Sequence, residues 1–328
     1  MKIGSFLKPV MRDFGKSRSK FYRDRWIINS LMNHVFRLPS DSKDIVLEVK
    51  LPRCSGHSIV PADYDSDRNL LFLHGGAMCL SMWKFYIPIA VALAKRTRSR
   101  LLLPDYRVAP GHPFPAGLED CQDALDWVIE TWGPIENLAI LGDSAGGNLA
   151  LNLATENKHL NSLTLMSPWL DLTHSSDWWS RESRDDVVFP LSARRAAWLY
   201  INGDEDWTFG SGDKDASDLF ELSLRDSRVS PLFADLTFSQ ETACLIQASA
   251  DERLLGDSIE LWKRLGGEIQ ESRLQQEPSP LNLSHGLHRF SVWRGVPHVW
   301  QVSRIRSQEA QEAISEIVEF VDHRFTTR

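Results

Sequence analysis

Short apolar runs, separated by amphipathic stretches, recur along the chain from about residue 44 onward. Residues 44–51 alternate between apolar and polar side chains, which is typical of an outer strand. The other runs are short and almost continuously apolar, a pattern that favours strands buried on both faces of a parallel sheet. These runs span residues 69–76, 100–106, 137–143, 162–168 and 242–250.

Between these runs, apolar residues recur at spacings of three and four, which places them on one face of a helix. One such set is Leu118, Cys121, Leu125 and Val128, and a second is Ala310, Ile314, Ile317 and Val321. Regular alternation of strands and helices predicts an α/β fold with a mostly parallel central sheet flanked by helices.

Two stretches interrupt this alternation. Residues 171–230 are rich in Trp, Asp, Ser and Arg and contain helical pieces but no strand-like run. A long insertion between two sheet strands commonly forms a lid or a binding region. Residues 273–288 are polar and contain proline, and they separate EIQES from FSVW, which otherwise look like parts of one strand. The second stretch is either a surface elaboration or a gene-model artefact such as a retained intron.

Composition is that of an ordinary globular protein, with 42% hydrophobic and 25% charged residues among 328. The four cysteines are far apart and form no CxxC or CxH motif, so we expect neither a metal site nor a redox centre. No apolar run is long enough for a signal peptide or a membrane-spanning helix. These features together predict a cytoplasmic protein with reduced thiols.

Charge is distributed unevenly. Residues 1–40 carry nine Lys and Arg against two Asp, a net charge of +7, so the remainder carries −14 of the chain total of −7. A basic amphipathic arm could touch an anionic membrane surface. The alternative, which we favour, is a cap segment whose charges face water while Phe6, Leu7, Val10 and Phe14 pack on a protein groove. The acidic remainder argues against a nucleic-acid partner.

The strongest chemical signal is Gly142-Asp143-Ser144-Ala145-Gly146, which follows an apolar run and precedes a helix pattern. A serine between a strand and a helix sits on a tight elbow that exposes its hydroxyl above the sheet, and flanking glycines let the backbone approach closely. The Ala145 N–H then lies at a helix N-terminus, where developing negative charge is stabilised. We therefore predict that Ser144 is a nucleophile.

A second signal is His74-Gly75-Gly76-Ala77, directly after the run NLLFL. Acyl transfer passes through a tetrahedral oxyanion, and a loop of adjacent glycines can aim successive N–H groups at it. We expect Gly75 and Gly76 to form the oxyanion hole with Ala145. His74 is expected to be structural rather than a base.

The base and the acid are sought later in the chain, because the serine, acid and histidine of this arrangement follow one another in that order. His298, in GVPHVW, stands on a loop before the last helix, and His285 and His288 are its nearby rivals. Asp251 and Glu252 both follow the run TACLIQASA, and either carboxylate could orient the imidazole.

These motifs together resemble the hormone-sensitive-lipase-like branch of the α/β-hydrolases, which includes bacterial and fungal esterases and arylacetamide deacetylases. The resemblance rests on HGGA (74–77), DYRVAPGHPFPAGLED (105–120), GDSAGGNLA (142–150), SPWLDL (167–172) and PHVW (297–300). It implies hydrolysis of a small-molecule carboxylic ester without a cofactor or metal. It also implies a helical cap made by an N-terminal arm (1–40) and an insertion (171–230) over a core of residues 41–170 and 231–328.

The register of similar family members favours Glu252 over Asp251 as the acid, because the family's acid has an apolar residue two positions on, which here is Leu254. Asp251 would then be a turn or N-cap residue of the following helix. Ala77 replaces the family's usual third glycine, but it retains its N–H. The alternatives are an amidase, a lactonase or an acyltransferase with the same triad, or a non-catalytic small-molecule-binding protein. The natural substrate and the oligomeric state stay open.

Overall fold

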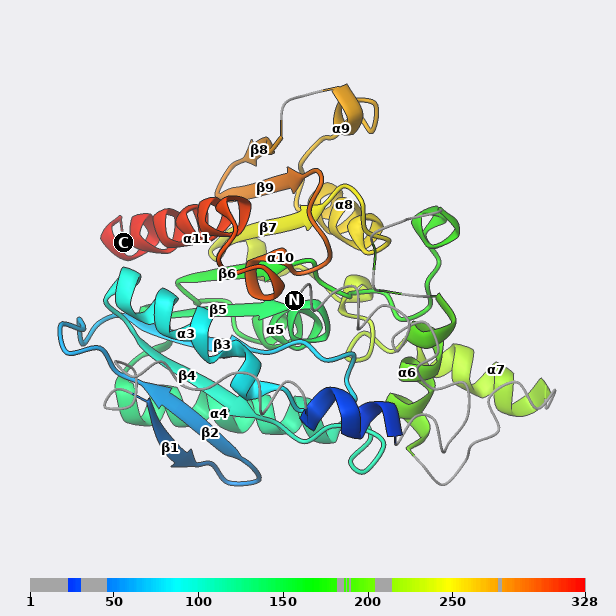
Figure 1. The fold of residues 1–328 in the computed structure, drawn as a ribbon, viewed down its shortest axis with the longest axis horizontal. Coiled ribbons are helices and arrows are strands. Elements are labelled where there is room, and N and C mark those ends of the chain that lie inside the picture. The colour runs from blue at the N-terminus through cyan, green and yellow to red at the C-terminus, as the bar shows by residue number, and fades with distance from the viewer. Residues whose placement is uncertain are drawn as a thin grey trace.

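The computed structural model describes residues 23–30, 46–181, 186, 188, 190–203, 214–276 and 279–327. Its described part contains a nine-stranded sheet in the order β1-β2-β4-β3-β5-β6-β7-β9-β8 (Figure 1). The strands are β1 (Val46–Lys50), β2 (Ser55–Ile59), β3 (Asn69–Leu73), β4 (Arg100–Asp105), β5 (Leu138–Asp143), β6 (Ser162–Met166), β7 (Ala243–Ser249), β8 (Leu281–His285) and β9 (His288–Trp293).

A parallel block of strands occupies the middle of the sheet. Strands β4, β3, β5, β6, β7 and β9 run parallel, while β2 pairs antiparallel with β4 at one side and β8 pairs antiparallel with β9 at the other. Every residue of β3, β5, β6 and β7 is buried. Burial on both faces explains why these strands are almost continuously apolar.

Helices cover both faces of the sheet, as Figure 1 shows. The longer ones are α3 (Trp83–Thr97), α4 (Ala116–Trp132), α5 (Ser144–Glu156), α6 (Pro190–Asn202), α7 (Lys214–Ser223), α8 (Leu255–Arg264) and α11 (Gln308–Thr326). Short α9 (Arg273–Gln276), α10 (Trp300–Ser303) and the 3₁₀ segments η2 (Ile135–Asn137), η3 (Asp177–Ser180), η4 (Pro231–Phe233) and η5 (Thr237–Gln240) complete the set, with a helix over residues 23–30. Helices α3 and α11 share one apolar core, and α4, α5 and α8 share the other.

The fold confirms the expected α/β architecture and adds details that the apolar pattern lacks. The six predicted strand segments contain β1, β3, β4, β5, β6 and β7. Strand β2 (SGHSI) escaped prediction because its sequence is mostly polar. Part of the 273–288 stretch forms α9 and the edge strand β8. The prediction that EIQES and FSVW form one strand is therefore wrong, because only FSVW lies in a strand, as part of β9.

The expected cap regions are described in part. In the 171–230 insertion, α6 and α7 lie beyond the carboxyl ends of the parallel strands, and the helix of residues 23–30, drawn dark blue, lies beneath that same end (Figure 1). Residues 1–22 and 31–40, with the four apolar residues expected to pack on a groove, lie outside the described residues.

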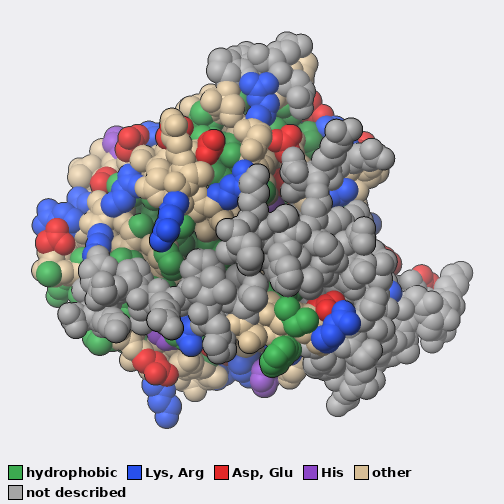
Figure 2. Space-filling model, in the orientation of Figure 1, with side chains coloured by type: hydrophobic (Ala, Val, Ile, Leu, Met, Phe, Trp, Pro, Cys, Tyr) green, Lys and Arg blue, Asp and Glu red, His purple; other side chains and the backbone are tan. Residues whose placement is uncertain are grey.

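None of the helices described is both long enough and apolar enough to cross a membrane. On the part of the described surface that faces the viewer in Figure 2, basic and acidic side chains are interspersed rather than gathered by sign.

Candidate active site

Ser144 lies at a sharp turn between β5, which ends at Asp143, and α5, which begins at Ser144 itself. Its φ of 49° is in the left-handed region, which non-glycine residues rarely adopt. The flanking glycines make this turn possible: a Cβ on Gly146 would lie 2.0 Å from the Leu73 carbonyl oxygen, and a Cβ on Gly142 2.3 Å from the Gly146 carbonyl oxygen. The G-x-S-x-G spacing is thus a packing requirement of the elbow.

Three side chains predicted from the sequence meet at this elbow. His298 Nε2 lies 3.0 Å from Ser144 Oγ, and His298 Nδ1 lies 2.6 Å from Glu252 Oε2. Glu252 is buried, and its Oε1 accepts a hydrogen bond of 2.9 Å from the Ser249 N–H. The carboxylate is therefore held from both sides, with one oxygen fixed by the backbone and the other directed at the imidazole. This order of contacts suits proton transfer from Ser144 to His298.

Electrostatics at His298 favour the protonated imidazole. Burial alone would lower the pKa of His298, but the hydrogen bond and charge of Glu252, together with the charges of Asp186 and Asp143, raise it above the ordinary value of 6.5. A carboxylate beside the imidazole stabilises the cation that forms when the serine loses its proton.

Asp251, the alternative acid, faces the backbone of Gly295 rather than the imidazole of His298. Its Oδ2 accepts a hydrogen bond of 2.7 Å from the Gly295 N–H, on the loop that leads to His298. Of the two roles expected for Asp251, that of a turn residue is confirmed, while that of a helix N-cap is wrong, because the N-cap of α8 is Leu254 and no side chain caps it. Asp251 instead ties the acid turn to the histidine loop.

The glycine loop after β3 differs from the prediction at Gly75. The Gly75 N–H donates to Asp143 Oδ1 at 2.9 Å and to Tyr86 Oη at 3.1 Å, so it is not available to an oxyanion. A Cβ on Gly75 would lie 2.4 Å from Asp143 Oδ2. Glycine is therefore required at this position because the Asp143 side chain approaches the backbone closely. Gly75 therefore holds the loop against the elbow, and the expectation that it is a donor is wrong.

The next two residues of this loop keep their N–H groups free. Gly76 has a φ of 140° and Ala77 a φ of 52°, and no acceptor within the described residues takes a hydrogen bond from either backbone nitrogen. The Ala145 N–H lies in the first turn of α5, where backbone donors lack an intrahelical partner. Within the described residues, no backbone or side-chain acceptor competes for the N–H groups of Gly76 and Ala77, and these two groups with that of Ala145 suit a developing negative charge.

Asp143 was not singled out from the sequence, although it stands directly before Ser144. It is buried and accepts hydrogen bonds from Tyr86 Oη at 2.8 Å and from the Gly75 N–H. Burial raises its pKa to about 7, against the opposing effect of these two donors. The signal that could have found it is its place inside the serine motif, where a buried carboxylate must find partners.

The other histidines considered as bases lie apart from Ser144. His74 is buried, stacks on Tyr106 with ring centroids 4.4 Å apart, and contacts the Gly75 carbonyl oxygen through Nδ1, as expected of a structural residue. His288 lies in β9, and its Nδ1 accepts a hydrogen bond from the Cys244 N–H. His285 would contact a Cβ placed on Gly266. None of the three makes a described contact with Ser144.

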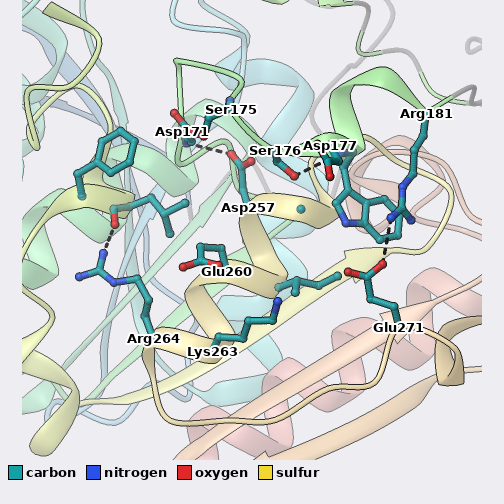
Figure 3. Close-up of a pocket in the computed structure, with 15 residues that line it drawn as sticks. Asp171, Ser175, Ser176, Asp177, Arg181, Asp257, Glu260, Lys263, Arg264 and Glu271 are labelled. Carbon is teal, nitrogen blue, oxygen red and sulfur yellow. Dashed lines mark hydrogen bonds and ion pairs between the residues drawn. The ribbon is translucent and has the colours of Figure 1, made fainter. Parts of the chain in front are cut away.

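A separate hollow lies beside α8 rather than at the serine. It has a volume of about 560 Å³ and is lined by polar side chains such as Asp257, Glu260 and Lys263 (Figure 3). None of its lining residues is Ser144, Glu252 or His298. Arg181 and Glu271 pair across its edge at 3.0 Å. Among the residues described, no cluster of three or more His, Cys, Asp or Glu is placed to hold a metal ion.

A central parallel sheet with a serine on the elbow after one of its strands defines the α/β-hydrolase class. A family model described as "alpha/beta hydrolase fold" matches residues 70–288, and the chain therefore belongs to this family. This finding confirms the fold that the motifs predicted.

Relatives and solved structures agree with the family. The chain is 26% identical to an esterase of Acinetobacter venetianus, covering 89% of this chain and 87% of that protein. It is 28% identical to the carboxylesterase/phospholipase LipF of Mycobacterium tuberculosis, covering 98% of this chain and 77% of that protein. An esterase from the bacterial hormone-sensitive lipase family has a similar fold, with a TM-score of 0.75 at 22% identity over 98% of both chains.

Proposed function

We propose that this chain is a serine esterase, which hydrolyses a small-molecule carboxylic ester through an acyl-enzyme intermediate on Ser144. The observation that carries the proposal is the chain of contacts from Ser144 Oγ to His298 Nε2 at 3.0 Å and from His298 Nδ1 to Glu252 Oε2 at 2.6 Å. Relatives that are named esterase and carboxylesterase support the same reaction class.

The reaction follows from these contacts in two halves. His298 accepts the Ser144 proton while Ser144 Oγ attacks the ester carbonyl carbon, and the N–H groups of Gly76, Ala77 and Ala145 stabilise the oxyanion. The intermediate collapses when the carbon–oxygen bond to the alcohol breaks, and His298 returns the proton to that alcohol. Water, deprotonated by His298, then attacks the acyl carbon; the bond from Ser144 Oγ to that carbon breaks, the acid leaves, and His298 returns the proton to Ser144 Oγ.

Turnover of p-nitrophenyl esters tests this function directly. The purified chain should hydrolyse p-nitrophenyl acetate and butyrate without added metal or cofactor, and matched aryl amides and lactones should react more slowly. Faster turnover of the amide or the lactone would favour an amidase or a lactonase, which use the same acyl-enzyme chemistry. No turnover of any of these compounds would favour the non-catalytic binding protein.

The pH dependence follows from the raised pKa of His298. A general base must be neutral to accept a proton, so activity is lost as pH falls through the pKa of the folded protein. Because Glu252 and the neighbouring carboxylates raise that pKa, the acid-side midpoint of kcat/KM should lie above 6.5. Initial rates between pH 4 and 9 measure the midpoint; a value below 6.5 would contradict the electrostatics described for His298.

We also propose that the helix of residues 23–30 and the 171–230 insertion act as a cap. Burial raises the pKa of the Cys79 thiol to about 12 and the positive charge of Arg25 opposes this rise, which supports a location of the helix beside the glycine loop. Ile28 joins the main core. A helix packed in this position would form part of the cap.

Deletion of residues 1–40 tests the cap. We expect the sheet to stay folded by circular dichroism, while KM rises or the preferred acyl length changes, because one wall of the substrate site is lost. Unchanged kinetics on every ester of the panel would contradict the cap role. Co-sedimentation with anionic liposomes tests the alternative, in which the basic arm contacts a membrane surface.

A further inference from the structure

One carboxylate of the 171–230 insertion reaches the turn that carries the triad acid. Asp186 is buried, and its Oδ2 accepts hydrogen bonds from the Arg253 backbone N–H at 2.9 Å and from Arg253 Nη1 at 3.3 Å. Its Oδ1 accepts a bond of 2.9 Å from the Val188 N–H, and Arg253 Nη1 also donates to the Val188 carbonyl oxygen at 3.0 Å. Arg253 is thus held by both its backbone and its side chain.

Arg253 directly follows Glu252, so this clamp acts on the turn that places the acid. Within the turn itself, the bonds from the Glu252 N–H to the Ser249 carbonyl and from the Leu255 N–H to the Glu252 carbonyl are both 3.4 Å, which is long. The bonds to Asp186 are shorter or charge-assisted and come from a segment more than 60 residues away along the chain. Besides the 2.9 Å bond from the Ser249 N–H to Glu252 Oε1, the position of Glu252 is therefore supported by contacts from outside its own turn.

The negative charge of Asp186 also acts on the imidazole of His298. The charged side chains that act on His298 are Glu252, Asp186 and Asp143, and all three favour the imidazolium. Burial raises the pKa of Asp186, while His298 and the Val188 and Arg253 N–H groups oppose this rise. The charges of Asp186 and Asp143 therefore act on the imidazolium in the same direction as the charge of Glu252.

We propose that Asp186 is a positioning residue for the catalytic triad, which fixes the Glu252 turn through Arg253. The proposal rests on the proposed esterase function and deepens it, because it links the insertion to the chemistry at Ser144. It assigns to the insertion a part in proton transfer in addition to any part in enclosing the substrate.

The test is Asp186→Asn, which keeps the shape of the side chain and removes its charge. The matched control is Asp120→Asn, since buried Asp120 likewise accepts both the backbone N–H of an arginine, Arg107, at 2.8 Å and its guanidinium at 2.7 Å. Asp120 is not among the groups that act on His298. We expect Asp186→Asn to lower kcat by about tenfold to a hundredfold, the range for a small misplacement of a catalytic group, with KM little changed.

A second readout does not depend on turnover. NMR titration of the His298 imidazole without substrate should show a lower pKa in Asp186→Asn than in the wild type and no change in Asp120→Asn. Arg253→Met removes the guanidinium bonds of this clamp to Asp186 and to the Val188 carbonyl oxygen, so it should lower kcat and the pKa of His298 in the same direction as Asp186→Asn. It also tests the proposal if Asp186→Asn does not fold, because an unchanged kcat in Arg253→Met would overturn the role of the clamp.

The outcomes separate the two proposals. A pKa of His298 that is unchanged in folded Asp186→Asn overturns the role of Asp186, and so does an unchanged kcat with only a lower melting temperature. Failure of the wild-type chain to hydrolyse any ester would overturn the proposed function, while the titration would still report whether Asp186 acts on His298.

Discussion

Replacing Ser144 with alanine should lower kcat for p-nitrophenyl butyrate by a factor of about 10⁶, because loss of the nucleophile of a serine triad typically costs this much. Within the described residues, the Ser144 hydroxyl has one side-chain hydrogen bond, to His298. Because little else is lost with the hydroxyl, the melting temperature should stay close to that of the wild type. KM should change little, since the groups that line the substrate site remain. Stopped-flow and steady-state kinetics on the purified variant measure the loss.

Ser167 offers a matched control. Like Ser144, it is a serine with a positive φ, 48°, and its hydroxyl accepts a bond of 3.4 Å from the N–H of Val299. Loss of so long a bond should cost at most about 1 kcal/mol, so Ser167→Ala should lower kcat no more than about tenfold. A Ser144→Ala variant that keeps most of its activity, or a Ser167→Ala variant that loses as much, would show that another group is the nucleophile.

Replacing Glu252 with glutamine should lower kcat by about 10⁴. The amide oxygen can keep the hydrogen bond from the Ser249 N–H, and the NH₂ group then faces His298 Nδ1. Nδ1 must accept that hydrogen bond, which places the ring proton on Nε2, where it blocks acceptance of the Ser144 proton. The fold should survive, because glutamine has nearly the same shape.

Asp251→Asn is the control for this variant. Its oxygen can still accept the bond from the Gly295 N–H, so kcat should stay within about tenfold of the wild type and the melting temperature should fall slightly. If Asp251→Asn abolishes turnover and Glu252→Gln does not, the acid is Asp251, and the contact between Glu252 and His298 is not the working one.

The architecture could be predicted because the apolar runs report burial on both faces. Runs such as 69–76 and 137–143 contain β3 and β5 because these strands lie inside the sheet between two layers of helices. Strand β2 has a mostly polar sequence, and β8 lies at the edge with most of its residues at least partly exposed. The sequence of β2 therefore offers no apolar run although most of its residues are buried, and β8 offers only a short alternation, Leu281 and Leu283, within a polar stretch.

Sequence motifs and register were enough to predict which residues form the candidate site. They were not enough to predict the direction in which individual backbone and side-chain groups point. Register alone preferred Glu252 to Asp251, and the structure places Glu252 beside His298. The direction of the Gly75 N–H could not be predicted, because it depends on Asp143 and Tyr86, and the contact with Tyr86 comes from the separate helix α3. Contacts between segments distant in the chain leave no local pattern, and Asp186 was missed for the same reason.

The most direct test of Ser144 as the nucleophile is to map the residue that diethyl p-nitrophenyl phosphate modifies. We expect one diethylphosphoryl group per chain, found by tandem mass spectrometry on the peptide that contains Ser144, with loss of esterase activity in proportion to labelling. Ser144→Ala should remain unlabelled. Inactivation with the phosphoryl group on a different residue, or full activity after stoichiometric labelling of Ser144, would contradict the assignment of Ser144 as the nucleophile.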